Sequence, residues 1–399
     1  MLASIIRTAI EKRGIFLMLC FLIIGFGLFS YQKLPIDAVP DITNVQVQIN
    51  TQAKGYSPLE TEQRITFLVE TVLAGLPNLD YTRSLSPYCL SQVTAVFEAG
   101  TDLFFARTLL NARLGIIKSQ LPDGIEPEMG PIATGLGEIY MYTLSAKPGT
   151  VTADGRKFDA MALRELHDWV VKPQLALVKG VTEVNAIGGF TKQYHVKPNP
   201  QLMLNYGVST DDLLRALERN NANQGAGYIE RNGQQILVRS QARLSSVEDI
   251  GNVVVTLTNQ SPVTVNDIAE VAIGKELRTG AATLEGQETV LGTAMMLIGE
   301  NSRAVALDVA DKVDEIQASL PEGVLIQSVY DRTALVDKAI NTVRKNLIEG
   351  ALLVIVVLFL LLGNIRAAII TAAVIPLAML ATITGMVRTG VSANLMSLG

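Results

Sequence analysis

The sequence predicts a mixed architecture, in which α-helical membrane spans flank an α+β region of two ferredoxin-like βαββαβ units with an insertion in the second. Two observations lead to this prediction. Of the 399 residues, 49% are hydrophobic and only 18% are charged, whereas average soluble chains carry about 25% charged residues, and the apolar excess lies at the two ends. Between the ends, the order strand–helix–strand–strand–helix occurs twice.

The first predicted span covers residues 14–32, an uncharged run between Arg13 and Lys33. A span needs about 17–25 mostly apolar residues. The alternative is a cleaved signal peptide, but no small-x-small cleavage site follows the run, which favours an uncleaved anchor. The basic residues within 1–13 predict a cytoplasmic N-terminus.

Two further spans are predicted near the other end, at 346–363 and 367–387, joined by a tight loop containing Arg366. Pro376 predicts a kink in the later span. The alternative, a buried hairpin of core helices, fits such closely joined apolar runs less well. Residues 388–399 are interpreted as the start of a truncated fourth helix, and the long middle segment is expected on the outer face of the membrane.

The first α+β unit is predicted at 33–134. Ser57, Pro58 and Glu60 form a helix-start signal, with Ser at the N-cap, Pro at the first position and an acid at the third. Its predicted strands are Val45–Thr51, Leu79–Leu85 and Gln92–Glu98. Its predicted helices run from the Ser57 N-cap to about Leu73 or Leu76, and from Asp102 to Gln120.

The second α+β unit is predicted in two parts, 135–199 and 266–331, followed by a lead-in helix at 332–345. Its closing helix ends in Leu-Pro-Glu-Gly-Val, as the first unit's ends in Leu-Pro-Asp-Gly-Ile. We interpret this likeness as an internal duplication. The predicted strands are Tyr140–Ser145, Val181–Ala186, Gln193–Val196 and Thr289–Ile298, and the helices are Asp159–Val178 and Ser302–Leu320.

The second unit is interrupted at 200–265 by a predicted subdomain with its own hairpin. Asn232 and Gly233 stand between two alternating runs, which is the strongest short-range signal for a β-hairpin. A projecting hairpin suggests a contact surface for another subunit. A hairpin packed on its own domain is an equally good interpretation of the sequence.

No pattern of catalytic residues is present, so the sequence predicts that the protein is not an enzyme. The only histidines, His167 and His195, lack metal-ligand spacing and are expected to be ordinary surface or capping residues. The spans hold no central ionisable group for a proton relay. The net charge of −5 argues against nucleic-acid binding. Weak metal-ligand candidates are Met141, Met295 and Met296, although methionine in a strand usually fills a core.

Several longer motifs resemble the heavy-metal-efflux branch of the resistance–nodulation–division (RND) transporter family. The resemblance covers essentially the whole chain, but well under half of a full family member. The motifs are Leu34–Val47 (LPIDAVPDITNVQV), Gly135–Tyr140 (GLGEIY), Gly299–Arg303 (GENSR), Ser319–Gly323 (SLPEG), Tyr330–Arg332 (YDR) and Asn394–Gly399 (NLMSLG).

The resemblance implies a homotrimer in the bacterial inner membrane, joined to a periplasmic membrane fusion protein and an outer-membrane channel. It implies export of divalent cations by proton influx, with no resident cofactor. The α+β units would be periplasmic porter subdomains and the insertion a docking subdomain. The family's relay carboxylates lie on the fourth span and its best-known periplasmic metal site in the second half, so neither maps onto a residue here.

Within the branch, Leu34–Val47 and Gly135–Tyr140 favour the cobalt–zinc–cadmium exporters. Two kinds of alternative stay open. One is an RND exporter of copper and silver, or of hydrophobic compounds. The other is a membrane-anchored periplasmic assembly fragment with no transport of its own.

Overall fold

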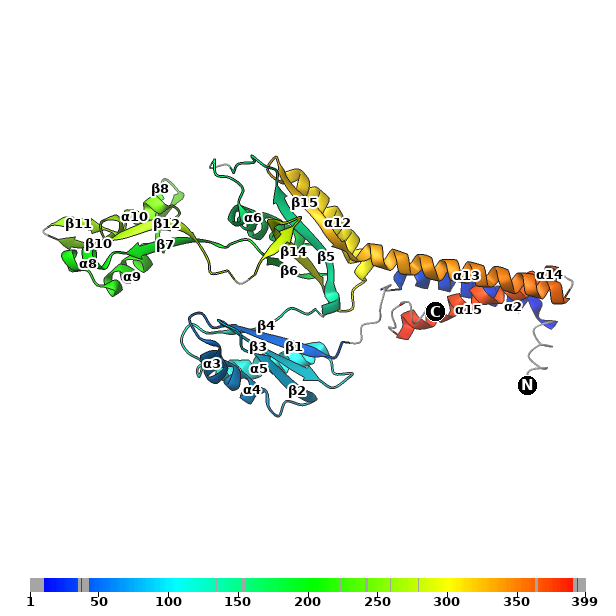
Figure 1. Ribbon diagram of the computed structural model, residues 1–399. Coiled ribbons are helices and arrows are strands. Elements are labelled where there is room, and N and C mark those ends of the chain that lie inside the picture. The colour runs from blue at the N-terminus through cyan, green and yellow to red at the C-terminus, as the bar shows by residue number, and fades with distance from the viewer. Residues whose placement is uncertain are drawn as a thin grey trace. The chain divides into compact units, whose positions relative to one another are not determined.

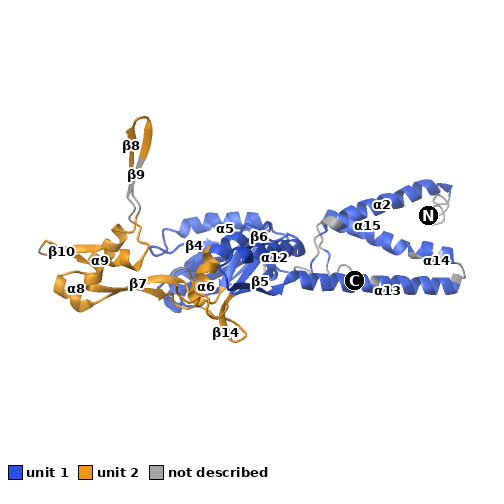
Figure 2. Ribbon diagram, turned by 90° about the horizontal axis from the view of Figure 1, so that it is seen from above, with its two compact units in different colours: residues 1–144, 170–186, 291–399 blue, residues 145–169, 187–290 orange. Residues whose placement is uncertain are grey.

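The computed structural model describes residues 11–34, 37, 43–133, 135–152, 155–222, 224–240, 243–258, 260–278, 280–362, 365–389 and 393 (Figure 1). The chain forms two compact units (Figure 2). The first comprises 1–144, 170–186 and 291–399, and the second comprises 145–169 and 187–290. The predicted start of a fourth helix at 388–399 lies almost wholly outside the described residues.

The first sheet has the order β2-β3-β1-β4 and pairs antiparallel where its register is given. Its strands are β1 (Gln46–Gln52), β2 (Leu79–Leu85), β3 (Leu90–Phe97) and β4 (Pro127–Met129). With α5 (Leu103–Ile117) and the helical run 58–73, the chain order is βαββαβ. This is the element order that the sequence predicts for residues 33–134.

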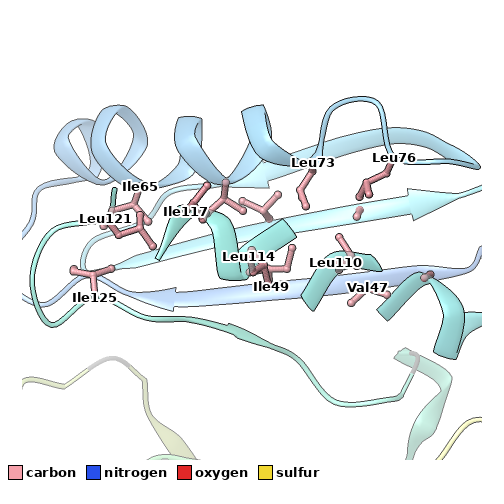
Figure 3. Packing of buried hydrophobic residues seen from close by; sticks show 14 of the residues in the cluster. Val47, Ile49, Ile65, Leu73, Leu76, Leu110, Leu114, Ile117, Leu121 and Ile125 are labelled. Atoms are coloured by element: carbon pink, nitrogen blue, oxygen red, sulfur yellow. The ribbon is translucent and has the colours of Figure 1, made fainter. Parts of the chain in front are cut away.

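Alternation along β1 places Val47 and Ile49 in the core, where they meet Leu110 and Leu114 of α5 (Figure 3). These side chains and their neighbours on β3 are fully or almost fully buried. At about 25 cal/mol per Å² of apolar surface removed from water, such burial is the main force holding helices onto the sheet.

The helical run on the first sheet starts where the sequence placed it. Ser57 Oγ accepts a hydrogen bond from the Glu60 backbone N–H, and Glu60 Oε2 accepts one from the Ser57 N–H at 3.0 Å, completing a capping box. The run comprises α3 (Pro58–Thr61), one π-helical turn (Glu62–Thr66) and α4 (Phe67–Leu73).

The second sheet has the order β13-β14-β5-β15, with β6 also paired to β14. Apart from the extra short strand β13, its chain order repeats that of the first sheet. Its strands are β5 (Glu138–Ala146), β6 (Val181–Ile187), β13 (Ala282–Leu284), β14 (Gln287–Met296) and β15 (Val324–Asp331). Its helices are α6 (Ala160–Leu166), a π-helical turn (His167–Val171), α7 (Lys172–Leu175) and α12 (Ser302–Ser319).

One strand assigned to the second unit has a different partner. The strand predicted at Gln193–Val196 forms as β7 (Lys192–Pro198), but it pairs antiparallel with β12 (Ala269–Lys275) in a separate two-stranded sheet. The inserted structure therefore begins before 200 and ends after 265. Strand propensity along the sequence says nothing about which distant strand will be the partner, so this pairing was not predictable.

The insertion has its own apolar core, which includes Met203, Leu213 and Ile268. Around this core lie α8 (Pro200–Tyr206), α9 (Thr210–Arg219), α10 (Val247–Gly251), β10 (Val254–Thr258), β11 (Ser261–Thr264) and α11 (Val265–Ile268). The predicted hairpin forms as β8 (Gln224–Arg231) and β9 (Gln234–Ser240).

The apolar ends of the chain are helical: α2 (Arg13–Lys33), α13 (Arg332–Leu362), α14 (Ile365–Ala372) and α15 (Val374–Thr389). Among the described residues, Arg13–Tyr31 and Ile369–Thr389 are long and apolar enough to cross a membrane. The predicted lead-in helix and residues 346–362 of the predicted span 346–363 belong to one continuous helix, α13; residue 363 lies outside the described residues. The helix is interrupted at Ala373, between α14 and α15 and three residues before Pro376. In an unbroken helix the ring of Pro376 would crowd the carbonyl of Ala372, four residues earlier.

Candidate functional site

The three candidate methionines do not converge on one site. Met295 and Met296 are consecutive in β14, so their side chains point to opposite faces of the sheet. Of the three, only Met296 is buried, whereas Met141 and Met295 are half-buried. The Nδ2 group of Asn185 donates to Met295 Sδ at 3.4 Å, which leaves that sulfur partly engaged.

The described residues hold no group of three or more His, Cys, Asp or Glu side chains that could bind a metal ion. The acidic side of α12 is exposed, as expected for a solvated face. Its carboxylates are Asp308, Asp311, Asp314 and Glu315.

The first sheet carries a polar hollow of about 270 Å³. Gln46 and Gln48 line it because they alternate with core residues along β1, and Arg83 Nη2 donates to Gln46 Oε1 at 3.2 Å. The lining includes no carboxylate, imidazole or sulfur atom. Its polar groups are amides, hydroxyls and one guanidinium, which are a poor ligand set for a transition-metal cation, so we do not assign a metal site to this hollow.

The hairpin turn has the backbone that its sequence predicts. Asn232 and Gly233 have φ values of 52° and 77°, as a two-residue turn with both central residues at positive φ requires. Along the hairpin, Tyr228, Ile229 and Ile236 are all exposed. The described part of the hairpin tip does not pack on its own domain, which favours the interpretation as a contact surface.

His167 is not the ordinary surface or capping residue that the sequence suggested. Its side chain is completely buried, and its Nδ1 lies 2.9 Å from Asp168 Oδ1. Arg164 Nε donates to the other carboxylate oxygen at 2.8 Å. The one available signal was the spacing of Arg164 and Asp168 by four helical positions. His195 lies half-buried on β7, with Nε2 3.3 Å from Gln193 Oε1.

The carboxyl group of Asp168 has its pKa shifted by this cluster. Burial by itself would raise the pKa of its carboxyl, but hydrogen bonds from His167 and Arg164 outweigh burial and hold the pKa below its usual value. The carboxylate is therefore charged at neutral pH. The cluster is a stabilising network, and nothing in it is arranged as a nucleophile or a metal site.

Two ion pairs at the start of α13 were not predicted from the sequence. Arg332 is 5% exposed and donates to Asp37 Oδ1 from Nη2 at 2.8 Å. Arg303, in the first turn of α12, donates from Nε to Asp337 Oδ1 at 2.7 Å. Both arginines lie within the resembling motifs, but only the three-dimensional structure supplies their partners.

Comparison with known proteins settles the family. The profile of the AcrB/AcrD/AcrF family matches residues 5–399. The chain belongs to this family of RND transporters. It is 59% identical, over its whole length, to the cobalt-zinc-cadmium resistance protein CzcA of Cupriavidus metallidurans. It is 43% identical to the nickel and cobalt resistance protein CnrA of the same organism.

A crystal structure of a heavy metal efflux pump superposes on 98% of the chain with a TM-score of 0.88 and 33% sequence identity. The chain covers 39% of that pump, 38% of CzcA and 39% of CnrA. It therefore spans less than two fifths of the length of the relatives it matches.

Proposed function

We propose that the chain is the N-terminal portion of the inner-membrane subunit of an RND pump that exports divalent heavy-metal cations such as cobalt, zinc or cadmium. The observation that carries this proposal is the 59% identity to a cobalt-zinc-cadmium resistance protein across all 399 residues. The overlap with a solved heavy metal efflux pump supports the same class of cargo.

In this proposal α2, the apolar part of α13, and α14 with α15 span the inner membrane. The two α+β units, each built on one of the larger sheets, are the periplasmic porter subdomains. The insertion is the docking subdomain. The repeated βαββαβ order supports a duplicated porter, because many transporters are built from internal repeats.

We assign the exposed hairpin β8–β9 to contact with a neighbouring protomer of a homotrimer or with the outer-membrane channel. A periplasmic membrane fusion protein completes the tripartite assembly. The exposed Tyr228, Ile229 and Ile236 support this role, since aromatic and aliphatic side chains clear of their own domain are typical of interface cores.

Proton influx is the proposed energy source. The carboxylates that would relay protons are expected on a fourth span, outside the described residues. The metal and the protons are cargo and coupling ions, so this proposal requires no resident cofactor.

Deleting the gene and measuring growth across zinc, cobalt, cadmium, copper and silver concentrations tests the cargo. The expected result is lower tolerance of zinc, cobalt or cadmium, restored by the gene on a plasmid. Unchanged tolerance of these three metals with raised sensitivity to dyes or detergents would instead indicate an exporter of hydrophobic compounds. Lower tolerance of copper and silver alone would indicate the other metal branch.

A further inference from the structure

The first residue of α13 is an arginine enclosed by separate segments of the chain. Arg332 is 5% exposed, and its Nε and Nη2 both donate to Asp37 Oδ1, at 3.2 and 2.8 Å. Asp37 follows α2 in the sequence, and its backbone N–H donates to the Ala393 carbonyl at 2.9 Å. The start of α13, the segment after α2 and the segment after α15 are therefore joined at one point.

A second pair holds α13 five residues further on. Asp337 accepts a hydrogen bond from Arg303 Nε at 2.7 Å, and the side chains are 47% and 40% exposed. Arg303 lies in the first turn of α12, whose N-cap is Asn301. Hydrogen bonding to Asp337 raises the pKa of the Arg303 guanidinium. Between the two pairs, Val336 is completely buried.

The two pairs differ in what their loss would do. Removing Asp37 leaves the Arg332 charge buried without its partner, and breaking a buried pair is far more costly than breaking an exposed one. The Arg303–Asp337 pair is half-exposed, so it adds little to stability. Its importance lies in its position, because it ties α12 of the second sheet to α13.

The helix α13 runs without a break from Arg332 to Leu362 (Figure 1). A shift of its apolar half therefore carries Arg332 and Asp337 with it. A packed helix moves as a rigid element between discrete arrangements.

We propose that Asp37–Arg332 and Arg303–Asp337 are positioning pairs, which couple displacement of α13 to α12 and to the segment that follows α2. The inference rests on the proposed export function, in which membrane and periplasmic parts must move together. None of these residues contacts cargo in this proposal.

The coupling itself can be measured without transport. Spin labels at Glu315 on α12 and Lys338 on α13, both exposed, would be placed in the full chain after Cys20→Ala and Cys89→Asn. Pulsed electron–electron double resonance should give a narrow distribution of distances between the two labels. Asp337→Asn should broaden that distribution. Reversing the pair, with Arg303→Asp and Asp337→Arg, should narrow it again.

Zinc flux in proteoliposomes under an imposed pH gradient tests whether this coupling affects transport, with the whole pump subunit, of which this chain is the proposed N-terminal portion, as the reconstituted protein. Asp37→Asn, Arg332→Gln and Asp337→Asn should each lower the initial rate about 2- to 30-fold, the usual range for coupling residues, with zinc affinity unchanged. Arg332→Lys keeps the charge and should retain more of the rate than Arg332→Gln. The control is Glu126→Gln, which breaks the exposed Lys118–Glu126 pair and should leave the rate unchanged.

Two results would overturn the proposal: a distance distribution that stays narrow in Asp337→Asn, or correctly assembled variants that transport at the wild-type rate. A wild-type protein that moves no zinc would contradict the proposed function alone. In that case the distance measurement still decides whether the pairs couple α13 to α12.

Discussion

At the scale of single residues, one glycine decides how tightly the second sheet packs. A Cβ atom at Gly292 would lie 2.2 Å from Cζ of Tyr142, whose side chain is completely buried. The sequence shows a glycine within a strand, which indicates a close approach. It does not show which side chain fills the space, because Tyr142 lies on another strand, 150 positions earlier.

Gly292→Val should therefore destabilise the protein by about 1–3 kcal/mol, the usual cost of overpacking a core. Urea unfolding followed by circular dichroism measures this loss. Gly115→Ala is the control, because nothing lies within 4 Å of its Cβ position on α5, and alanine should stabilise that helix by about 0.5–1 kcal/mol. Equal stability of Gly292→Val and wild type would contradict the described packing.

Asp168 gives a prediction about pH. Because its pKa is lowered on folding, its carboxylate stabilises the fold at pH values above the unfolded pKa of about 3.9. That contribution is lost as the pH falls through the lower folded value. Asp168→Asn should thus be less stable than wild type at pH 7, and the difference should shrink below about pH 4. A difference that grows on acidification would refute the assigned charge state.

At the scale of elements, α2 and α15 pack closely within the first compact unit (Figure 2). Gly27 permits this approach, since a Cβ there would lie 2.6 Å from Leu380 Cβ. Small residues commonly allow membrane helices to approach in this way. Leu34 is buried beside Ile383 and Met386, close to the end of the same pair of helices.

Gly27→Leu should separate α2 from α15 and lower stability in detergent by about 1–3 kcal/mol. Gly25→Leu is the matched control, because nothing lies within 4 Å of its Cβ position on the same helix. Thermal unfolding of both variants measures the difference. The described packing is wrong if the two substitutions have equal effects.

Helix starts, helix ends and turns could be predicted where the sequence signal lies in a few adjacent residues. The Ser57 capping box, the turn at Asn232 and Gly233, and the helix stop after α12 each depend on a few adjacent residues. The partner of β7 and the two ion pairs of α13 depend on contacts across long stretches of chain. Asp37 and Arg332 are 295 positions apart, and no local pattern indicates such a pairing.

At the scale of the whole molecule, composition and repetition predicted the architecture of apolar helical ends and two ferredoxin-like units. The three methionine candidates cannot all belong to one site, because adjacent strand residues face opposite sides of a sheet and Met295 and Met296 are adjacent. The sequence alone offered no ligand set, and the described residues offer none either. Cargo selection therefore remains part of the proposed function.

The most direct measurement is zinc movement in proteoliposomes that contain a zinc-sensitive dye and the whole pump subunit, of which this chain is the proposed N-terminal portion. The account predicts that zinc crosses the membrane against an imposed proton flow, at a rate that a protonophore abolishes. Cobalt or cadmium should compete with zinc. No zinc, cobalt or cadmium flux from a correctly assembled protein in the presence of a pH gradient would contradict the account.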